Sequence, residues 1–292
     1  TIIKLIPLLL MAVIGTIVGL GNGMVVENFT TVVDASKSSG TALFTAVVAT
    51  AFAFEGWIIA TSINAELKDA KKNLPRALVL GTLIVVGVYI LYYIGLSGSV
   101  SNAALMESGE AGARTAFETI FSRVGGTVLF VFVVISCLGT LNGLMLGCTR
   151  GMYALAARRR GPAPAIFKQV DGKTNMPTNS SVLGLLLCAF WLVYFYSAQL
   201  TTPWFGPICF DSSELPIVTI YALYLPIFFM AIRKEKDFSP VKRFVAFPLA
   251  IAGSLFMIVA AFFAHGKNVF WYLVVFAAFM AVGWFFRKEK QL

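Results

Sequence analysis

Length, composition and charge exclude most soluble protein classes for this sequence. The chain has 292 residues, of which 58% are hydrophobic and only 13% are charged, and its mean hydropathy is +0.83. A soluble domain usually carries about a quarter charged residues, because its surface must be solvated. The net charge of +9 does not indicate nucleic-acid binding, since the basic residues lie between apolar runs and do not form a basic face with interleaved aromatic residues.

Eight apolar runs are long enough to cross a membrane as α-helices. A spanning helix needs about 20 apolar residues to cross a hydrocarbon core of ~30 Å. The runs are too long for strands and lack the alternation of polar and apolar residues that marks a membrane barrel. We therefore expect an all-α membrane protein. The predicted spans are 5–26, 41–63, 77–98, 124–149, 182–200, 215–232, 244–264 and 269–286.

Lys and Arg are distributed unevenly between the loops that join these spans. When the loops are assigned alternately to two sides, one side holds nineteen of the 23 basic residues. The other side holds only Lys37, Arg114, Arg123 and Lys267. The positive-inside rule places the richer side in the cytoplasm. We expect a multi-pass protein of the cell (inner) membrane, with both termini and the loops 64–75, 158–176 and 233–242 in the cytoplasm.

Cysteine and histidine form no pattern typical of a metal or catalytic site. Cys137, Cys148 and Cys188 lie in apolar runs, where a thiol is most often a small hydrophobe, and Cys209 lies in a predicted outer loop. Since the chain has a single His and no cluster at ligand spacing, no metal or cofactor is expected. The sequence opens at Thr1, close to an apolar run, which we interpret as the start of a fragment.

One predicted outer connection contains a possible helix. In Ala111–Arg123, the residues Phe117, Ile120 and Phe121 recur at helical spacing. The segment is therefore either a short surface helix or an ordered loop.

The second run contains the only charged side chain well inside a predicted span. It reads Ala49-Thr-Ala-Phe-Ala-Phe-Glu-Gly-Trp57. A carboxylate at the centre of a membrane helix costs on the order of 2.5–3.5 kcal/mol, so Glu55 should face a cavity or a partner. Gly56 weakens the helix beside it. Two interpretations stay open: a helix broken near 52–56 that meets a substrate, or a continuous helix whose Glu bonds to a neighbour.

Several motifs, in this order, resemble the amino acid–polyamine–organocation (APC) family, and its L-amino-acid-transporter branch most closely. Those that resemble the sixth helix and the inner loop after it are Phe52-Ala-Phe-Glu-Gly-Trp57, Ala65-Glu-Leu-Lys68 and Lys72-Asn-Leu-Pro-Arg-Ala77. Those that resemble the eighth helix and its cytoplasmic end are Gly139-Thr-Leu-Asn-Gly143, Arg150 and Arg160-Gly-Pro162. The resemblance covers the whole chain, as helices five to twelve of twelve.

This resemblance implies a fold of five plus five inverted helices with two extra helices. Residues 1–292 would form one transmembrane domain. Within it, 5–26 would be the fifth helix, 41–232 the second inverted repeat, and 244–286 the two additional helices. The first helix, whose Gly-rich break binds the substrate carboxylate in the family, would be absent. The chain would then hold the ammonium and side-chain half of a substrate site.

The resemblance also implies substrate contacts around the second run. Phe52 matches the aromatic gate that the family places over bound substrate. Ala53 and Phe54 would follow it into an unwound stretch, where their carbonyl groups would bind the substrate ammonium, and Gly56 would permit the break. Glu55 would either line the pocket, where it could favour cationic substrates or carry a proton, or bond to a neighbouring helix.

Three residues outside this run have two possible roles each. Asn142 either faces the site or holds helices together. Lys4 is either an interfacial lysine whose head reaches water or the fifth-helix lysine that stands where sodium-coupled relatives hold a cation. Glu66 is expected at the inner gate or as a helix cap.

The function implied is secondary transport of amino acids, with neutral L-amino acids moved by exchange or by proton-coupled symport. A carrier of cationic amino acids or polyamines, or a sensor built on a transporter fold, remains an alternative. A channel filter or ring of charges is not visible, nor is a set of paired acids or a nucleophile and base that an enzyme would need. The expected partners are an amino-acid substrate and the lipid bilayer, without nucleic acid.

Overall fold

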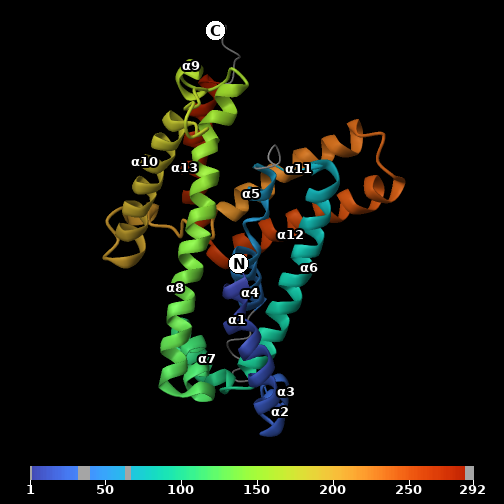
Figure 1. Ribbon diagram of the computed structural model, residues 1–292, viewed down its shortest axis with the longest axis vertical. Helices are drawn as coiled ribbons and strands as arrows, with labels where there is room; N and C mark the ends of the chain where they lie inside the picture. The colour runs from blue at the N-terminus through green and yellow to red at the C-terminus, as the bar shows by residue number, and fades with distance from the viewer. Residues whose placement is uncertain (1, 32–39, 63–66, 287–292) are drawn as a thin grey trace. The chain divides into compact units, whose positions relative to one another are not determined.

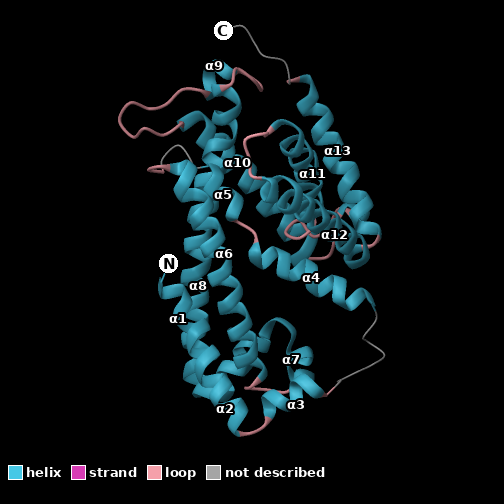
Figure 2. Cartoon of the chain, turned by 90° about the vertical axis from the view of Figure 1, so that its right-hand side faces the viewer, coloured by secondary structure: helices cyan, strands magenta, loops and turns pink. Residues whose placement is uncertain are grey.

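The computed structural model describes residues 2–31, 40–62 and 67–286, and these form helices and loops without a strand (Figures 1 and 2). Seven helices in this part of the chain are long and apolar enough to cross a membrane. They span Ile3–Gly21, Ala70–Ser97, Gly112–Ala157, Thr178–Leu200, Pro216–Lys234, Lys242–His265 and Lys267–Phe285. The prediction of an all-α membrane protein is confirmed. The remaining predicted run, the second in the chain (41–63), is divided into α4 (Gly40–Phe54) and α5 (Trp57–Ser62).

The chain packs as two compact units. Unit 1 comprises Thr1–Ala35 and Gly56–Gly147, and unit 2 comprises Ser36–Glu55 and Cys148–Leu292. Within the described residues, the chain passes from one unit to the other between α4 and α5 and again within α8 (Gly112–Ala157). The expectation of a single domain with an inverted repeat stays a prediction.

The first span of unit 1 consists of three consecutive helical segments. These are α1 (Ile2–Leu10), a π-helical turn at Met11–Gly15, and α2 (Thr16–Gly21). The predicted run 5–26 continued further, but Gly23 has a φ of +78° and turns the chain into α3 (Met24–Thr30). Glycine adopts this conformation readily because it has no Cβ.

Glycines bring the first span against α6 (Ala70–Ser97), its neighbour in Figure 1. A Cβ added to Gly95 would collide with the carbonyl oxygen of Met11, and one added to Gly98 would collide with that of Gly15. On the facing helix, a Cβ added to Gly19 would collide with the Cα of Gly98. Small residues at such crossings let two helix backbones approach closely within a membrane.

A network around Asn28 ties α3 to the end of α6 and to α7 (Asn102–Ser108). The Asn28 amide donates to the carbonyl oxygens of Ser97 (2.6 Å) and Val100 (2.9 Å). The Asn102 backbone amide donates in return to the Asn28 side-chain oxygen at 2.9 Å. These bonds satisfy carbonyl groups at the α6 terminus, which a helix leaves without intrahelical partners.

The sequence allowed either a helix or an ordered loop for residues 111–123 of the predicted outer connection, and most of this segment is helical. Residues 112–121 form the first part of α8, and Ser122, with φ 62° and ψ −177°, separates it from the long helix that follows. Phe117 in this first part is 4% exposed and packs against Phe121, with ring centroids 5.6 Å apart. The helical interpretation is therefore confirmed for residues 112–121.

In unit 2, α4 packs against α12 (Phe247–His265), which also contacts α11 (Pro216–Lys234) (Figure 1). The Phe44 ring of α4 stacks on Phe263 of α12 with centroids 4.8 Å apart. A hydroxyl pair, Thr219 of α11 and Tyr272 of α13 (Lys267–Phe285), lies 2.7 Å apart in the same core. Aromatic stacking and buried hydroxyl pairs of this kind fix helix orientation where lipid supplies no hydrophobic drive.

The remaining helix of unit 2, α10 (Thr178–Phe195), continues as a π-helical turn to Leu200. Its Tyr194 hydroxyl donates to the Ile208 carbonyl at 2.6 Å and accepts from the Phe210 amide at 3.1 Å. Phe210 is 1% exposed, so these two bonds anchor the connection between α10 and α11 in the core. A short helix, α9 (Pro164–Phe167), lies in the basic connection before α10.

Candidate functional site

The chain leaves helical geometry inside the second predicted span. α4 ends at Phe54, Glu55 and Gly56 form a turn, and α5 begins at Trp57. Gly56 has a φ of +108°, which residues with a side chain rarely adopt. The predicted departure from helical geometry is confirmed, but it is shorter than expected. Phe52, Ala53 and Phe54 stay helical, because the Ala- and Phe-containing run supports a helix until glycine allows the turn.

The end of α4 has the polarity that attracts a cation. The carbonyl groups of the last helical turn, which includes Ala53 and Phe54, point along the axis toward the break and form the negative end of the helix dipole. This end can interact favourably with an ammonium group. Phe52 lies in the same turn of α4, and its role as a gate stays a prediction.

Glu55 lies at the break together with two tyrosines that the sequence did not single out. Its carboxylate is within electrostatic range of the hydroxyl groups of Tyr221 and Tyr224 on α11. The two tyrosine rings meet edge to face with centroids 5.6 Å apart, and Tyr224 is 8% exposed. Their spacing of three residues places them on one helix face. Nothing in the sequence indicates that this face meets Glu55.

Lys4 reaches the eighth-helix motif of unit 1. Its Nζ donates to Thr140 Oγ1 on α8 at 3.3 Å. A Cβ added to Gly139 would lie 2.8 Å from both Nζ and Cε of Lys4, so this glycine makes room for the lysine. The structure therefore directs Lys4 toward α8, and both of its predicted roles stay predictions.

The roles of two further predicted site residues are not tested by the described geometry. Asn142 follows Thr140 by two residues on α8 and belongs to unit 1, so its contact with a substrate stays a prediction. Glu66 lies outside the described residues.

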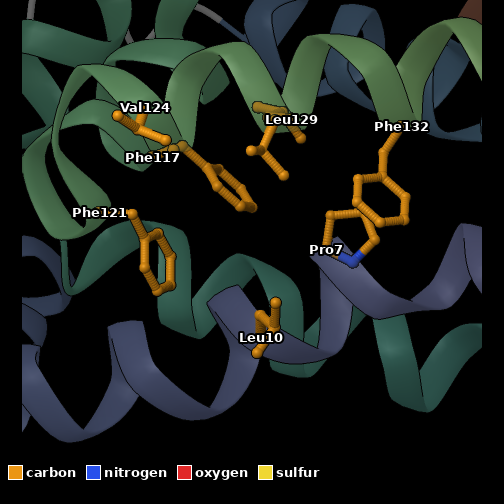
Figure 3. Close-up of a pocket in the computed structure, with 9 residues that line it drawn as sticks. Pro7, Leu10, Phe117, Phe121, Val124, Leu129 and Phe132 are labelled. Carbon is orange, nitrogen blue, oxygen red and sulfur yellow. The ribbon is translucent and has the colours of Figure 1, made fainter.

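A pocket of unit 1 has a different character from the helix break. Figure 3 shows side chains of α1 and α8 around a cavity of about 230 Å³, among them Pro7, Leu10, Phe117, Phe121 and Phe132. All of its lining residues are apolar. An amino-acid zwitterion leaves water only where its two charged groups find polar partners. This pocket therefore does not match an amino-acid site.

Charged groups outside the predicted spans of unit 2 gather in the connection before α11. Burial raises the pKa of the Asp211 carboxyl, but hydrogen bonds from the Ser213 side chain and from the amides of Ser213 and Glu214, with His265 nearby, bring it below its usual value. The Oε2 atom of Glu214 in turn lies 3.2 Å from Nε2 of His265, at the end of α12. Among the described residues, no group of three or more His, Cys, Asp or Glu side chains could hold a metal ion.

Comparison with known proteins identifies the family. The model of the amino acid permease family matches residues 1–286. The serine/threonine exchanger SteT of Bacillus subtilis is 30% identical over 220 residues, which cover 73% of this chain and 48% of SteT. The human cystine/glutamate transporter is 27% identical over 151 residues, which cover 52% of this chain and 29% of that transporter.

The matches therefore span about half, or less, of the length of these relatives. The family model, in contrast, runs through nearly the whole chain and includes both parts of the broken helix. The chain belongs to the amino acid permease family.

Proposed function

We propose that this chain is the C-terminal part of a secondary transporter that moves amino acids across a membrane. The observation that carries the proposal is the break at Glu55–Gly56 inside an apolar run. In transporters, such breaks present helix ends and backbone carbonyl groups to the substrate at membrane depth. The resemblance supports helices equivalent to the first four upstream of this chain, with 41–232 as the second inverted repeat and 244–286 as two added helices.

The substrates proposed are neutral L-amino acids, carried by exchange or by proton-coupled symport. The carbonyl groups of Ala53 and Phe54 would recognise the ammonium group that all amino acids share. Discrimination would then come from Phe54, Glu55 and Asn142, with Phe52 closing over the substrate. The name of the Bacillus relative, a serine/threonine exchanger, supports small neutral substrates.

A carrier of cationic amino acids or polyamines is the second candidate. Glu55 and the faces of Tyr221 and Tyr224 are groups that attract a cationic side chain, the first by charge and the others through their ring quadrupoles. Both candidates use the same helix break. They differ in whether Glu55 meets the side chain of the substrate.

Exchange in proteoliposomes tests the function and separates the candidates. The protein encoded by the complete gene is reconstituted into liposomes that are loaded with serine. The uptake of labelled serine, arginine and putrescine into these liposomes is then measured. We expect serine to exchange at least about tenfold faster than arginine. Faster arginine exchange would favour the cationic carrier, and putrescine transport equal to that of arginine would favour a polyamine carrier. Tight binding of an amino acid without any exchange would favour a sensor built on a transporter fold.

The proposed orientation places both termini and the basic loops in the cytoplasm, because these loops hold most of the Lys and Arg residues. In a protein without native cysteines, Lys173→Cys in an inner loop should resist an impermeant maleimide added to intact cells. Ala103→Cys in α7, within the proposed outer connection, should be labelled. Both side chains are exposed, so accessibility within the protein does not bias the comparison. Labelling of position 173 but not 103 would reverse the orientation.

Lys4 is proposed to supply the positive charge that sodium supplies in coupled relatives, so exchange should not depend on sodium. Replacing Na⁺ by choline should change the exchange rate less than about twofold. Lys4→Met removes the charge and should lower the rate at least about tenfold. Thr140→Val is the matched control, because it removes only the hydrogen bond to Lys4, worth about 0.5–1.5 kcal/mol. Equal exchange by Lys4→Met and the parent protein would contradict this role.

A further inference from the structure

Two cysteines from different helices of unit 2 lie side by side. Cys188 of α10 donates a hydrogen bond through its Sγ to Cys148 Sγ of α8 at 3.6 Å. Neither is in a disulfide, and Cys148 is exposed on the surface of the chain. Nothing in the sequence indicates that they pair, because they lie in different apolar runs 40 residues apart.

The contact between α8 and α10 holds this pair in place. Ser180, Gly184 and Cys188 follow one another at four-residue spacing, so they share one face of α10. The Ser180 hydroxyl donates to the Thr149 carbonyl at 2.6 Å and accepts from the Tyr153 amide at 3.0 Å. This hydroxyl therefore lies between the carbonyl and the amide of two α8 residues one helical turn apart.

Gly184 brings the two backbones together beside the thiols. A Cβ added there would lie 2.8 Å from the Cys148 carbonyl oxygen, closer than such atoms approach. The next residue of the same α10 face is Cys188, one turn further along. Ser180 is 1% exposed, and the contacts at Ser180 and Gly184 together fix the distance between the helices at the thiol pair.

We propose that Cys148 and Cys188 form a dithiol modification site, which two-electron oxidants convert to a disulfide that links α8 to α10. A disulfide has sulfurs about 2.05 Å apart, so from 3.6 Å they must approach by about 1.5 Å. Rotation of two side chains can supply a movement of this size. The helices do not need to separate or change register.

The reaction with a peroxide balances without another reactant. The sulfur of Cys148, the more exposed thiol, attacks one peroxide oxygen, the O–O bond breaks, and a sulfenic acid and one water form. The Cys188 sulfur then attacks the sulfenic sulfur, the S–O bond breaks, and a second water leaves. Two thiols and one hydrogen peroxide thus give one disulfide and two waters.

The same geometry suits small thiophilic reagents that bridge two sulfurs. Two sulfurs bound to one tetrahedral ion at about 2.3 Å each lie about 3.8 Å apart, close to the 3.6 Å seen here. Phenylarsine oxide also bridges two neighbouring sulfurs, through an arsenic that is three-coordinate in the product. Its arsenic forms bonds to both sulfurs while its oxygen leaves as water, and no electron is transferred. Cys188 lies ten residues into α10, about 15 Å from the helix start, so uncharged, membrane-permeant reagents are required.

Oxidative linking tests the proposal directly. The purified protein is treated with hydrogen peroxide, and the remaining free thiols are blocked with N-ethylmaleimide. The monomer is isolated, so that disulfides between two molecules are excluded. Trypsin then cleaves the chain in the connection 158–176, which contains Arg158 and Lys168. The two fragments should stay joined on a non-reducing gel and separate on reduction. Cys148→Ser is the matched control, because it keeps Cys137 on α8 and Cys188 on α10. It should give less than about a tenth of the linked product.

A second measurement uses no oxidant. One equivalent of phenylarsine oxide should protect both Cys148 and Cys188 from maleimide labelling, and a small dithiol should reverse the protection. In Cys148→Ser or Cys188→Ser, protection of the remaining thiol should weaken at least about tenfold. Absence of linked fragments in the parent protein together with absence of arsenical protection would overturn the proposal. Equal linking in Cys148→Ser would also overturn it.

Discussion

Gly95→Ala is expected to destabilise the protein severely, because the added methyl group meets backbone that cannot move aside. A Cβ at this position would collide with the Met11 carbonyl oxygen and would lie 2.9 Å from the Ala12 Cα. Overpacking in a close-packed interior typically costs about 1–3 kcal/mol. The collision here is with main chain, so we expect the upper part of that range. Thermal unfolding in detergent, followed by size-exclusion chromatography, should show the loss.

Gly87→Ala on the same helix is the matched control for this substitution. Nothing lies within 4 Å of a Cβ at Gly87, and alanine favours a helix over glycine by up to about 1 kcal/mol. Gly87→Ala should therefore leave the melting temperature unchanged or raise it. A melting temperature of Gly95→Ala within about 2 °C of the parent would show that α6 and the first span do not cross this closely.

Hydropathy predicted the spans well and their ends less well, for a physical reason. The run 77–98 corresponds to α6, but that helix begins at Ala70 and includes Lys71 and Lys72. Likewise, α8 continues to Ala157, past Arg150. A membrane helix can extend into water, where polar residues are favourable, and hydropathy stops at the edge of the apolar region. The basic loops and the helix ends therefore overlap.

The break at Gly56 was predictable because it depends on local chemistry. A glycine beside a carboxylate in an apolar run marks a weak point in the helix, and the turn lies at Glu55–Gly56. The partners of that point were not predictable. Tyr221 and Tyr224 lie on α11, far from Glu55 in the sequence, and a single sequence does not show which helices are neighbours.

Gly56→Ala is expected to abolish most transport while leaving stability nearly unchanged. At a φ of +108°, a residue with a side chain is strained by on the order of 1–3 kcal/mol. The chain can relieve this strain by returning to helical φ, which would join α4 and α5 into one continuous helix. Nothing lies within 4 Å of a Cβ at Gly56, so no steric collision opposes the change. The expected loss is thus in function and not in packing.

The proposed mechanism gives the size of this effect. If the broken form of the helix binds substrate and the continuous form does not, each 1.4 kcal/mol that favours the continuous form lowers the competent population about tenfold. Exchange in proteoliposomes should fall at least about tenfold, with a melting temperature within a few degrees of the parent. Gly81→Ala on α6, where a Cβ also meets nothing within 4 Å and φ is not positive, should exchange at the parental rate. If Gly56→Ala exchanged at the rate of the parent protein, the break would not be needed in the transport cycle. The substrate contacts proposed for Ala53 and Phe54 would then also have to be withdrawn.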